Sequence, residues 1–218
     1  MSGQGAENEA STPLDPAALD PGTSVLLAGP AMTGKRRLLF DLVGGSPDEG
    51  AILVSTKRDA DRFRREFLET RADPEGWETR VVDCVSKSRS VRGTRDSATT
   101  KYVSSAGDLT GIGIATSGFM REFHHESREA RFGLHSLSTL LMYADLKRVF
   151  QFCHVMTGRM ETAGISGVFS LDTTARGAES LDVLKGLFDA MVEVRDAEEG
   201  PECRVRGGEF GPRQWTPF

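Results

Sequence analysis

A glycine and lysine pattern near the amino terminus carries the clearest chemical signal. Residues 25–36 read VLLAGPAMTGKR, in which an apolar run leads to Gly29, four further residues, Gly34 and Lys35. Glycines at both ends let backbone N–H groups approach phosphate oxygens, while the lysine adds positive charge at the start of a helix. The pattern therefore predicts a phosphate-binding loop, with an ordinary strand-to-helix turn as the alternative. The expected contact residues are Gly29, Pro30, Ala31, Met32, Thr33, Gly34, Lys35 and Arg36.

One position of this loop departs from the usual pattern. The residue after the lysine is normally Ser or Thr, whose hydroxyl binds Mg²⁺, and here it is Arg36. A guanidinium cannot bind a cation, but it can add a second positive charge beside a bound phosphate. Thr33 could replace the missing hydroxyl only weakly from its place in the loop. The loop is therefore expected to hold phosphate better than it holds a metal.

The elements that would position this loop follow an alternating order. Short apolar runs alternate with longer segments of helical periodicity, which predicts an α/β fold with a mostly parallel sheet. The predicted strands are residues 24–28, 51–55, 80–84, 132–135, 167–172 and 190–195, with a terminal hairpin over 202–206 and 213–217. The predicted helices are residues 35–43, 59–70, 108–125, 137–160 and 178–189. Asp108 is expected to cap the third of these helices.

A second motif lies one hundred positions after the lysine. Residues 131–141 read RFGLHSLSTLL and resemble the metal-binding (Walker B) strand of KaiC-like RecA-superfamily ATPases, where an apolar strand ends in Asp-Ser-Leu-Ser. His135 stands at the aspartate position. Neutral imidazole is a poor ligand for Mg²⁺, which prefers oxygen. By itself His135 could be a metal ligand, a base or a buried histidine, and the last is favoured because no partner ligand has a suitable spacing.

A third segment departs from the same family in the same direction. In KaiC-like proteins the strand after the first helix ends near glutamates that activate water, and the matching residues here are Thr56, Lys57 and Arg58. None of them is a carboxylate base. Asp59 follows directly, and it is expected to cap the next helix unless a shift in the alignment makes it the base.

Further blocks strengthen the resemblance. Residues 104–114, SSAGDLTGIGI, resemble a block of the KaiC-like proteins widespread in haloarchaea, as do residues 167–172, 184–189 and the final WTPF. The likeness covers roughly residues 14–218. It implies a three-layer α/β/α sandwich with a RecA-like P-loop core, a strand between the two motif strands, and relatives that are ATPases, often assembled as rings or filaments. Asp172, at the end of a strand beside the loop strand, is expected either to contact the ligand or to end the strand.

Length, charge and cysteine content exclude several other classes of protein. The chain has 218 residues and a net charge of −5, and its three cysteines have no CxxC spacing. One domain over residues 23–218 is expected, preceded by a flexible tail over residues 1–22. No segment is apolar enough to cross a bilayer, so we expect a cytoplasmic protein without a membrane partner.

Residues 86–105 are expected to form a long basic loop inside this domain. Few apolar side chains anchor it, so disorder is the favoured interpretation, and a nucleic-acid contact is the alternative. The basic residues are Lys87, Arg89, Arg92, Arg95 and Lys101.

Three functions remain open at this point. The preferred one is a regulatory or assembly subunit with a degenerate P-loop, which holds ATP or ADP weakly through the loop, His135 and Asp172 and hydrolyses it slowly or not at all. The missing ligands make Mg²⁺ a doubtful cofactor, and a protein partner or self-assembly is expected. The alternatives are an ATPase completed by shifted residues or by a neighbouring subunit, and a nucleic-acid-binding module that uses residues 86–105.

Overall fold

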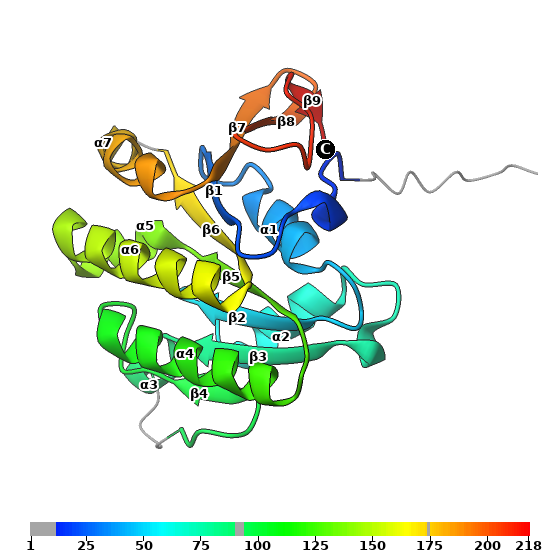
Figure 1. The fold of residues 1–218 in the computed structure, drawn as a ribbon. Helices are drawn as coiled ribbons and strands as arrows, with labels where there is room; N and C mark the ends of the chain where they lie inside the picture. The colour runs from blue at the N-terminus through cyan, green and yellow to red at the C-terminus, as the bar shows by residue number, and fades with distance from the viewer. Residues whose placement is uncertain (1–11, 90–93, 174) are drawn as a thin grey trace, which may run out of the picture.

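A single sheet of nine strands runs through the protein (Figure 1). The structure is a computed structural model that describes residues 12–89, 94–173 and 175–218. In spatial order the strands are β4-β3-β2-β5-β6-β1-β7-β8-β9. The strands from β4 to β7 are parallel, whereas β8 and β9 are antiparallel to their neighbours. The strand bounds are β1 Ser24–Gly29, β2 Gly50–Ser55, β3 Glu78–Asp83, β4 Thr100–Tyr102, β5 Ala130–His135, β6 Ser166–Asp172, β7 Ala190–Ala197, β8 Gly200–Arg206 and β9 Thr216–Pro217.

Helices cover both faces of this sheet, which gives the predicted three-layer α/β/α sandwich. Helices α4, α5, α6 and α7 pack on one face, and α1 and α2 pack on the other (Figure 1). The helix bounds are α1 Lys35–Val43, α2 Ala60–Leu68, α3 Ser86–Arg89, α4 Leu109–His125, α5 Leu137–Tyr143, α6 Leu146–Ala163 and α7 Ala175–Leu184, with short 3-10 turns at Pro16–Ala18, Pro74–Gly76 and Lys185–Leu187. Asp108 caps α4 by accepting a hydrogen bond from the Gly111 N–H, as predicted.

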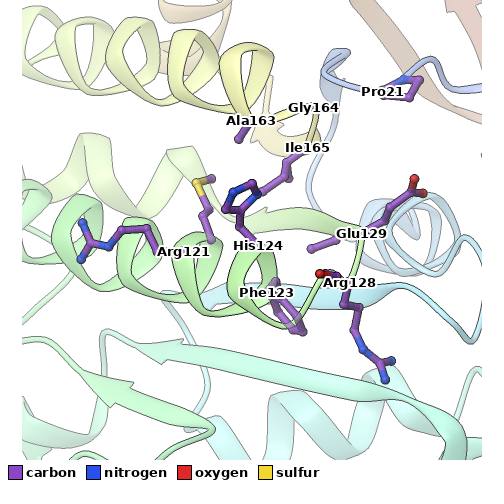
Figure 2. Close-up of a pocket in the computed structure, with 12 residues that line it drawn as sticks. Pro21, Arg121, Phe123, His124, Arg128, Glu129, Ala163, Gly164 and Ile165 are labelled. Atoms are coloured by element: carbon purple, nitrogen blue, oxygen red, sulfur yellow. The ribbon is translucent and has the colours of Figure 1, made fainter.

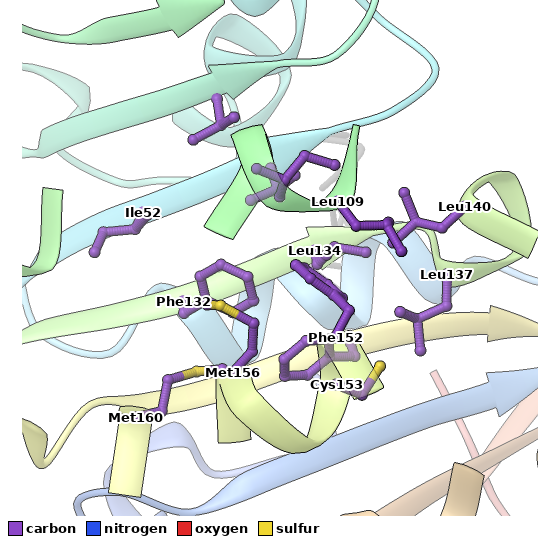
Figure 3. Packing of buried hydrophobic residues seen from close by; sticks show 14 of the residues in the cluster. Ile52, Leu109, Phe132, Leu134, Leu137, Leu140, Phe152, Cys153, Met156 and Met160 are labelled. Carbon is purple, nitrogen blue, oxygen red and sulfur yellow. The ribbon is translucent and has the colours of Figure 1, made fainter. Parts of the chain in front are cut away.

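Two apolar clusters, one on each side of the sheet, fix the positions of the strands. Figure 3 shows the larger cluster, in which Phe132 and Leu134 of β5 pack with Phe152 and Met156 of α6. The central strands β1 and β2 are buried along their whole length, as expected for a parallel sheet with both faces covered. All three cysteines are buried and free.

The expected helix over residues 137–160 is wrong as a single element. It is two helices, because the backbone is extended at Ala144 and Asp145 then caps α6 by accepting a hydrogen bond from the Arg148 N–H. The apolar periodicity continues across this break, and a cap residue is the local signal that marks it. The predicted helix over 178–189 also ends early, and Asp189 instead accepts hydrogen bonds from the N–H and hydroxyl of Ser24.

The expected tail over residues 1–22 is wrong from residue 12 onward, and residues 1–11 lie outside the described part of the chain. Leu14 and Leu19 are buried in the smaller cluster, and the Asp15 N–H donates to the Phe210 carbonyl. Two isolated leucines give little sequence signal, but the terminal strands provide a surface on which they pack.

Residues 86–105 are not a structureless loop where the structure describes them. They contain α3 and the edge strand β4, which pairs in parallel with β3. Residues 90–93 lie outside the described residues. The predicted C-terminal hairpin is present as β8 and β9, with Cys203 opposite Thr216, although its second strand is shorter than expected.

No helix among the described residues is long and apolar enough to span a bilayer.

Candidate functional site

The loop between β1 and α1 has the geometry that its sequence predicts. Helix α1 begins at Lys35, directly after Gly34, whose φ of 76° favours glycine. A side chain at Gly29 would place its Cβ 2.5 Å from the Val194 carbonyl oxygen, so only glycine fits there. Met32 also has a positive φ, and its side chain is fully exposed at the tip of the loop. The strand and the helix thus fix a tight loop at the carboxyl edge of the sheet.

Lys35 is folded back onto this loop. Its ammonium group donates to the carbonyl oxygens of Gly29, at 2.9 Å, and of Pro30, and it pairs with Asp172 Oδ1 at 3.0 Å. An ammonium group has three donors, so these contacts occupy all of them. Burial lowers the pKa of Lys35, and the contact with Asp172 offsets part of this effect. A phosphate that reached Lys35 would therefore compete with Asp172.

Asp172 is held at this place by the register of the sheet. It ends β6 and lies opposite Gly29 of β1, and its N–H donates to Ser138 Oγ at 2.7 Å. Lys57 approaches its other oxygen, Oδ2, at 3.4 Å. Burial raises the pKa of Asp172, but the hydrogen bond from Lys35 and the charges of both lysines outweigh burial and leave the pKa below its ordinary value. Asp172 is therefore an ionised carboxylate between two ammonium groups.

A pocket of about 420 Å³ opens over the loop, within the range of small-molecule sites. Its lining is Ala31, Met32, Thr33, Gly34, Lys35, Arg36, Lys57, Arg58, His135 and Asp172. Four of these side chains are cations and only one is a carboxylate. Gly29 and Pro30 lie behind the lining, where their carbonyl oxygens hold Lys35. Most of the predicted contact residues therefore meet in one pocket with an excess of positive charge.

The arginines of the pocket are oriented by a carboxylate behind it. Glu66 of α2 pairs with Arg36 and with Arg58, at 3.3 Å in each case, and with Arg62 at 3.0 Å. This glutamate neutralises part of the charge. Three arginines against one carboxylate still leave the cluster positive and attractive to anions.

His135 occupies the place of the expected metal-binding aspartate, at the end of β5. Its Nδ1 lies 2.8 Å from Ser170 Oγ, and its ring stacks on Phe63 with centroids 6.3 Å apart. Burial, followed by the positive charges of Lys57 and Arg36, lowers the pKa of His135 to about 3. The ring is therefore neutral near pH 7 and adds no charge to the pocket.

The site does not fit Mg²⁺. The Thr33 hydroxyl donates to the Pro30 carbonyl, and Thr56 bonds to the backbone of His135 and Ser136, so both hydroxyls are engaged in structural bonds. Within residues 12–89, 94–173 and 175–218, no group of three or more His, Cys, Asp or Glu side chains could hold a metal ion. The one carboxylate of the pocket, Asp172, is already paired with two lysines. Mg²⁺ beside a nucleotide is usually bound by one or two protein oxygens in addition to phosphate and water, and the candidate oxygens named here, Thr33, Thr56 and Asp172, are all engaged in other bonds.

The other carboxylates of this sheet edge are engaged elsewhere. Asp59 caps α2 by accepting a hydrogen bond from the Arg62 N–H at 2.9 Å, as the sequence favoured. Asp83, fully buried at the end of β3, accepts bonds from three backbone N–H groups and from the Ser86 hydroxyl. Neither of them lines the pocket.

The predicted nucleic-acid contacts are partly engaged as well. Lys101 pairs with Glu122 at 2.7 Å, and Lys87 donates to the Tyr102 carbonyl. Arg89 and Arg95 are exposed, and Arg92 lies outside the described residues. Of the predicted basic surface, Arg89 and Arg95 are therefore seen exposed without an ion pair among the described residues.

Lys57 and Arg58 are the site residues that sequence reasoning missed. They were noted only because they replace glutamates, yet both line the pocket. The available signal is positional. Lys57 and Arg58 lie two and three residues after the end of β2, β2 is paired with β5, and the carboxyl ends of parallel strands form the usual binding edge.

A family model matches residues 22–194, and its description is a family of unknown function, DUF7504. The chain belongs to this family. No curated protein matches it. Among solved structures, the KaiC-like protein PH0186 from the hyperthermophilic archaeon Pyrococcus horikoshii OT3 is similar, with a TM-score of 0.60 over 90% of this chain and 84% of that chain at 14% identity. At this identity the likeness shows the fold, so this DUF7504 protein has the RecA-like α/β architecture that its motifs predicted, with β6 between the loop strand β1 and β5.

Proposed function

We propose that this protein is a P-loop domain that binds the phosphate groups of a nucleotide such as ATP or ADP, needs little Mg²⁺ to do so, and hydrolyses the nucleotide slowly or not at all. The observation that carries the proposal is the pocket lined by Lys35, Arg36, Lys57 and Arg58 with Asp172 as its one carboxylate. Four cations can balance polyphosphate charge that a metal would otherwise neutralise.

Binding is supported by the loop and by the way its lysine is held. The loop supplies the strand, the glycines and the helix start that a phosphate cradle requires. Lys35 already points toward the carboxyl edge, where it pairs with an oxygen anion. A phosphate oxygen would take the place of the Asp172 oxygen, and the displaced carboxylate would keep its contact with Lys57. Affinity is therefore expected to be weak, since the ligand competes with an internal anion.

Slow or absent turnover follows from the groups that are missing. Metal-assisted charge neutralisation and the positioning of water each contribute several kcal/mol to phosphoryl transfer. Arg36 and His135 stand where metal ligands are expected, and Lys57 and Arg58 stand where a base is expected. Each loss of about 1.4 kcal/mol costs about tenfold in rate, so the combined loss amounts to several orders of magnitude.

A protein that binds a nucleotide without turning it over suits regulation or assembly. Release of Asp172 from Lys35 would change the ends of β6 and of the loop, and a partner that contacts this edge would sense the change. We therefore infer a regulatory or assembly role that is exerted through a protein partner or through copies of the same chain.

Two alternatives remain predictions with less support. An ATPase completed by shifted residues would need Asp59 or Asp172 as a base, whereas Asp59 caps α2 and Asp172 is paired with lysines. A neighbouring subunit would then have to supply the carboxylates. A nucleic-acid module would rely on the exposed Arg89 and Arg95, since Lys101 is paired with Glu122.

Calorimetry with ATP and ADP, with and without Mg²⁺, tests the proposal. We expect binding that changes less than about twofold with Mg²⁺ and weakens about 50-fold to 100-fold in Lys35→Ala, as expected for the loss of a charged hydrogen bond with its neighbour left unpaired. Lys185→Ala is the matched control, because Lys185 is an exposed lysine that pairs with Asp182 and does not line the pocket.

Phosphate release measured on the same samples separates the alternatives. Binding without release above background supports the proposal. Release that requires both Mg²⁺ and Lys35 would establish an active ATPase instead. Absence of any Lys35-dependent binding would reject the phosphate site itself.

A further inference from the structure

A continuous groove follows the seam between α4 and α6, on the outer surface of one helical layer. Three adjoining hollows make up this groove. The hollow near the start of α4 has a volume of about 320 Å³ and shares Ile114 and Arg159 with the next, of about 430 Å³. That hollow shares Met120 and Arg121 with a third, of about 550 Å³, at the end of α4. Figure 2 shows this third hollow, between Arg121 and His124 of α4 and the segment from Ala163 to Ile165.

The groove is long enough for a short helix, and its floor is apolar. Helix α4 has 17 residues and α6 has 18, so the seam is about 25 Å long at 1.5 Å per residue. Ile114 and Val155 line the first hollow and are 67% and 48% exposed, while Phe152 and Met156 lie beneath them. Exposed apolar side chains gathered in a groove are typical of a protein-binding surface.

The rim of the first two hollows is positive and contains no Asp or Glu, and Glu129 is the one carboxylate that lines the third hollow. Arg121, Arg148 and Arg159 line the hollows and are exposed, and Lys147, which precedes Arg148 on α6, is exposed as well. None of the four forms an ion pair with any residue in the described part of the chain. Elsewhere in the described residues eleven arginines pair with Asp or Glu, although the chain as a whole has a net charge of −5.

The sequence explains this local imbalance. Residues 109–121 and 146–160 contain no Asp or Glu at all. Arg159 instead reaches across the seam and donates to Ser117 Oγ of α4 at 2.7 Å. The protein is acidic and pairs most of its cations internally, yet these rim cations have no ion pair among the described residues. Such a positive face attracts negative charge from a partner.

We propose that this groove binds an acidic amphipathic helix of a partner protein. Its apolar side chains would pack on Ile114 and Val155, and its carboxylates would pair with Arg121, Arg148 and Arg159. A nucleic acid could pair its phosphates with the arginines, but its polar backbone would then lie on the apolar floor. A flat bilayer would not enter a groove between two helices. The surface is separate from the phosphate pocket, so the inference stands without the function proposed above.

Fluorescence anisotropy with the full chain tests the proposal. The probe is a labelled amphipathic peptide of about 18 residues, long enough for the seam, with Leu at helical spacing on one face and Glu on the flanks. We expect it to bind at least about tenfold more tightly than a scrambled peptide of the same composition, and than a version with Lys in place of Glu. Arg121→Glu and Arg148→Glu are each expected to weaken binding about tenfold.

Arg65→Glu is the matched control, since Arg65 is an exposed arginine of α2, has no ion pair among the described residues, and lies on the opposite face of the sheet. This variant should change the affinity less than about twofold. Equal affinity for the scrambled peptide, or equal loss in Arg65→Glu, would reject the groove as the binding site. Tighter binding of single-stranded DNA or of anionic phosphatidylserine vesicles, lost in the same two variants, would also overturn the proposal.

Methyl NMR of ¹³C-labelled methionine locates the bound peptide. Met120 and Met156 line the groove, and Met32 lies at the phosphate loop. The peptide should shift the first two signals and leave the third unchanged. Concentration-dependent self-association that disappears in Arg148→Glu, with no peptide binding, would assign the groove to a second copy of the chain and overturn the proposal of a foreign helix.

Discussion

The carboxyl edge of the sheet has two halves that present different chemistry. At the ends of β1 and β6, the loop glycines, Lys35 and Asp172 form the proposed phosphate cradle. At the ends of β2 and β5, where metal and water would be handled, stand Lys57 and the neutral, stacked His135. The two halves share one pocket.

Phosphate binding and phosphate chemistry make separate demands on one fold, and the function proposed above rests on this separation. A cradle depends on backbone geometry and positive charge, which survive as long as the strand, the turn and the helix survive. Hydrolysis depends on carboxylates at particular strand ends, and single substitutions remove them without disturbing the packing. In this protein the second half presents Lys57 and Arg58, and under the function proposed above these cations strengthen anion binding and supply no base for turnover.

Among the effects that separate the two halves, the largest concerns His135 and the pH dependence of stability. Its pKa is about 3 in the folded protein and near 6.5 when unfolded. Between these values the unfolded chain binds more protons, so the free energy of unfolding should fall as the pH falls, by about 1–2 kcal/mol from pH 7 to pH 5. Denaturant unfolding of His135→Asn should show a smaller decrease over the same interval.

His154→Asn is the control for this measurement, because His154 is exposed on α6. The comparison is made between two pH values within each variant, so a loss of stability common to both values cancels. An unchanged pH dependence in His135→Asn would mean that this half of the site is open to water rather than packed.

The next effect would convert the second half of the site. Arg36→Thr combined with His135→Asp places an oxygen ligand at each expected metal position, and Mg²⁺ should then strengthen ADP binding about tenfold. Calorimetry of the double variant and of both single variants, with and without Mg²⁺, measures this change. If the double variant stays independent of Mg²⁺, the two halves differ in backbone geometry and not only in side chains.

The smallest effect concerns Asp172, the anion that joins the two halves. Asp172→Asn removes the charge that competes with phosphate for Lys35, and binding of ADP should tighten about fivefold, or about 1 kcal/mol. Titration of this variant beside Asp182→Asn, an exposed carboxylate paired with Lys185, isolates the effect. Weaker binding in Asp172→Asn would mean that Asp172 holds Lys35 in place for the ligand and does not compete with it.

Local patterns predicted the elements that local interactions stabilise. The first helix was predicted with its observed bounds, because a glycine turn, a lysine and an apolar periodicity all mark it. The caps at Asp59 and Asp108 were predicted for the same reason. The break between α5 and α6 was missed, since the apolar positions on both sides face the same cluster and the pattern continues through Ala144.

The sequence by itself determined the α/β class and the glycine and lysine loop between β1 and α1, because both depend on residue types at short spacing. It also placed Arg36 and His135 at the positions where the resemblance implies metal ligands. Only the tertiary structure decided that Asp172 pairs with Lys35, that Lys57 and Arg58 join the pocket, and that Leu14 and Leu19 pack on the domain. It also decided that the free arginines of α4 and α6 line one groove. These features join segments far apart in the chain, and their positions depend on the order of strands and helices in the sheet.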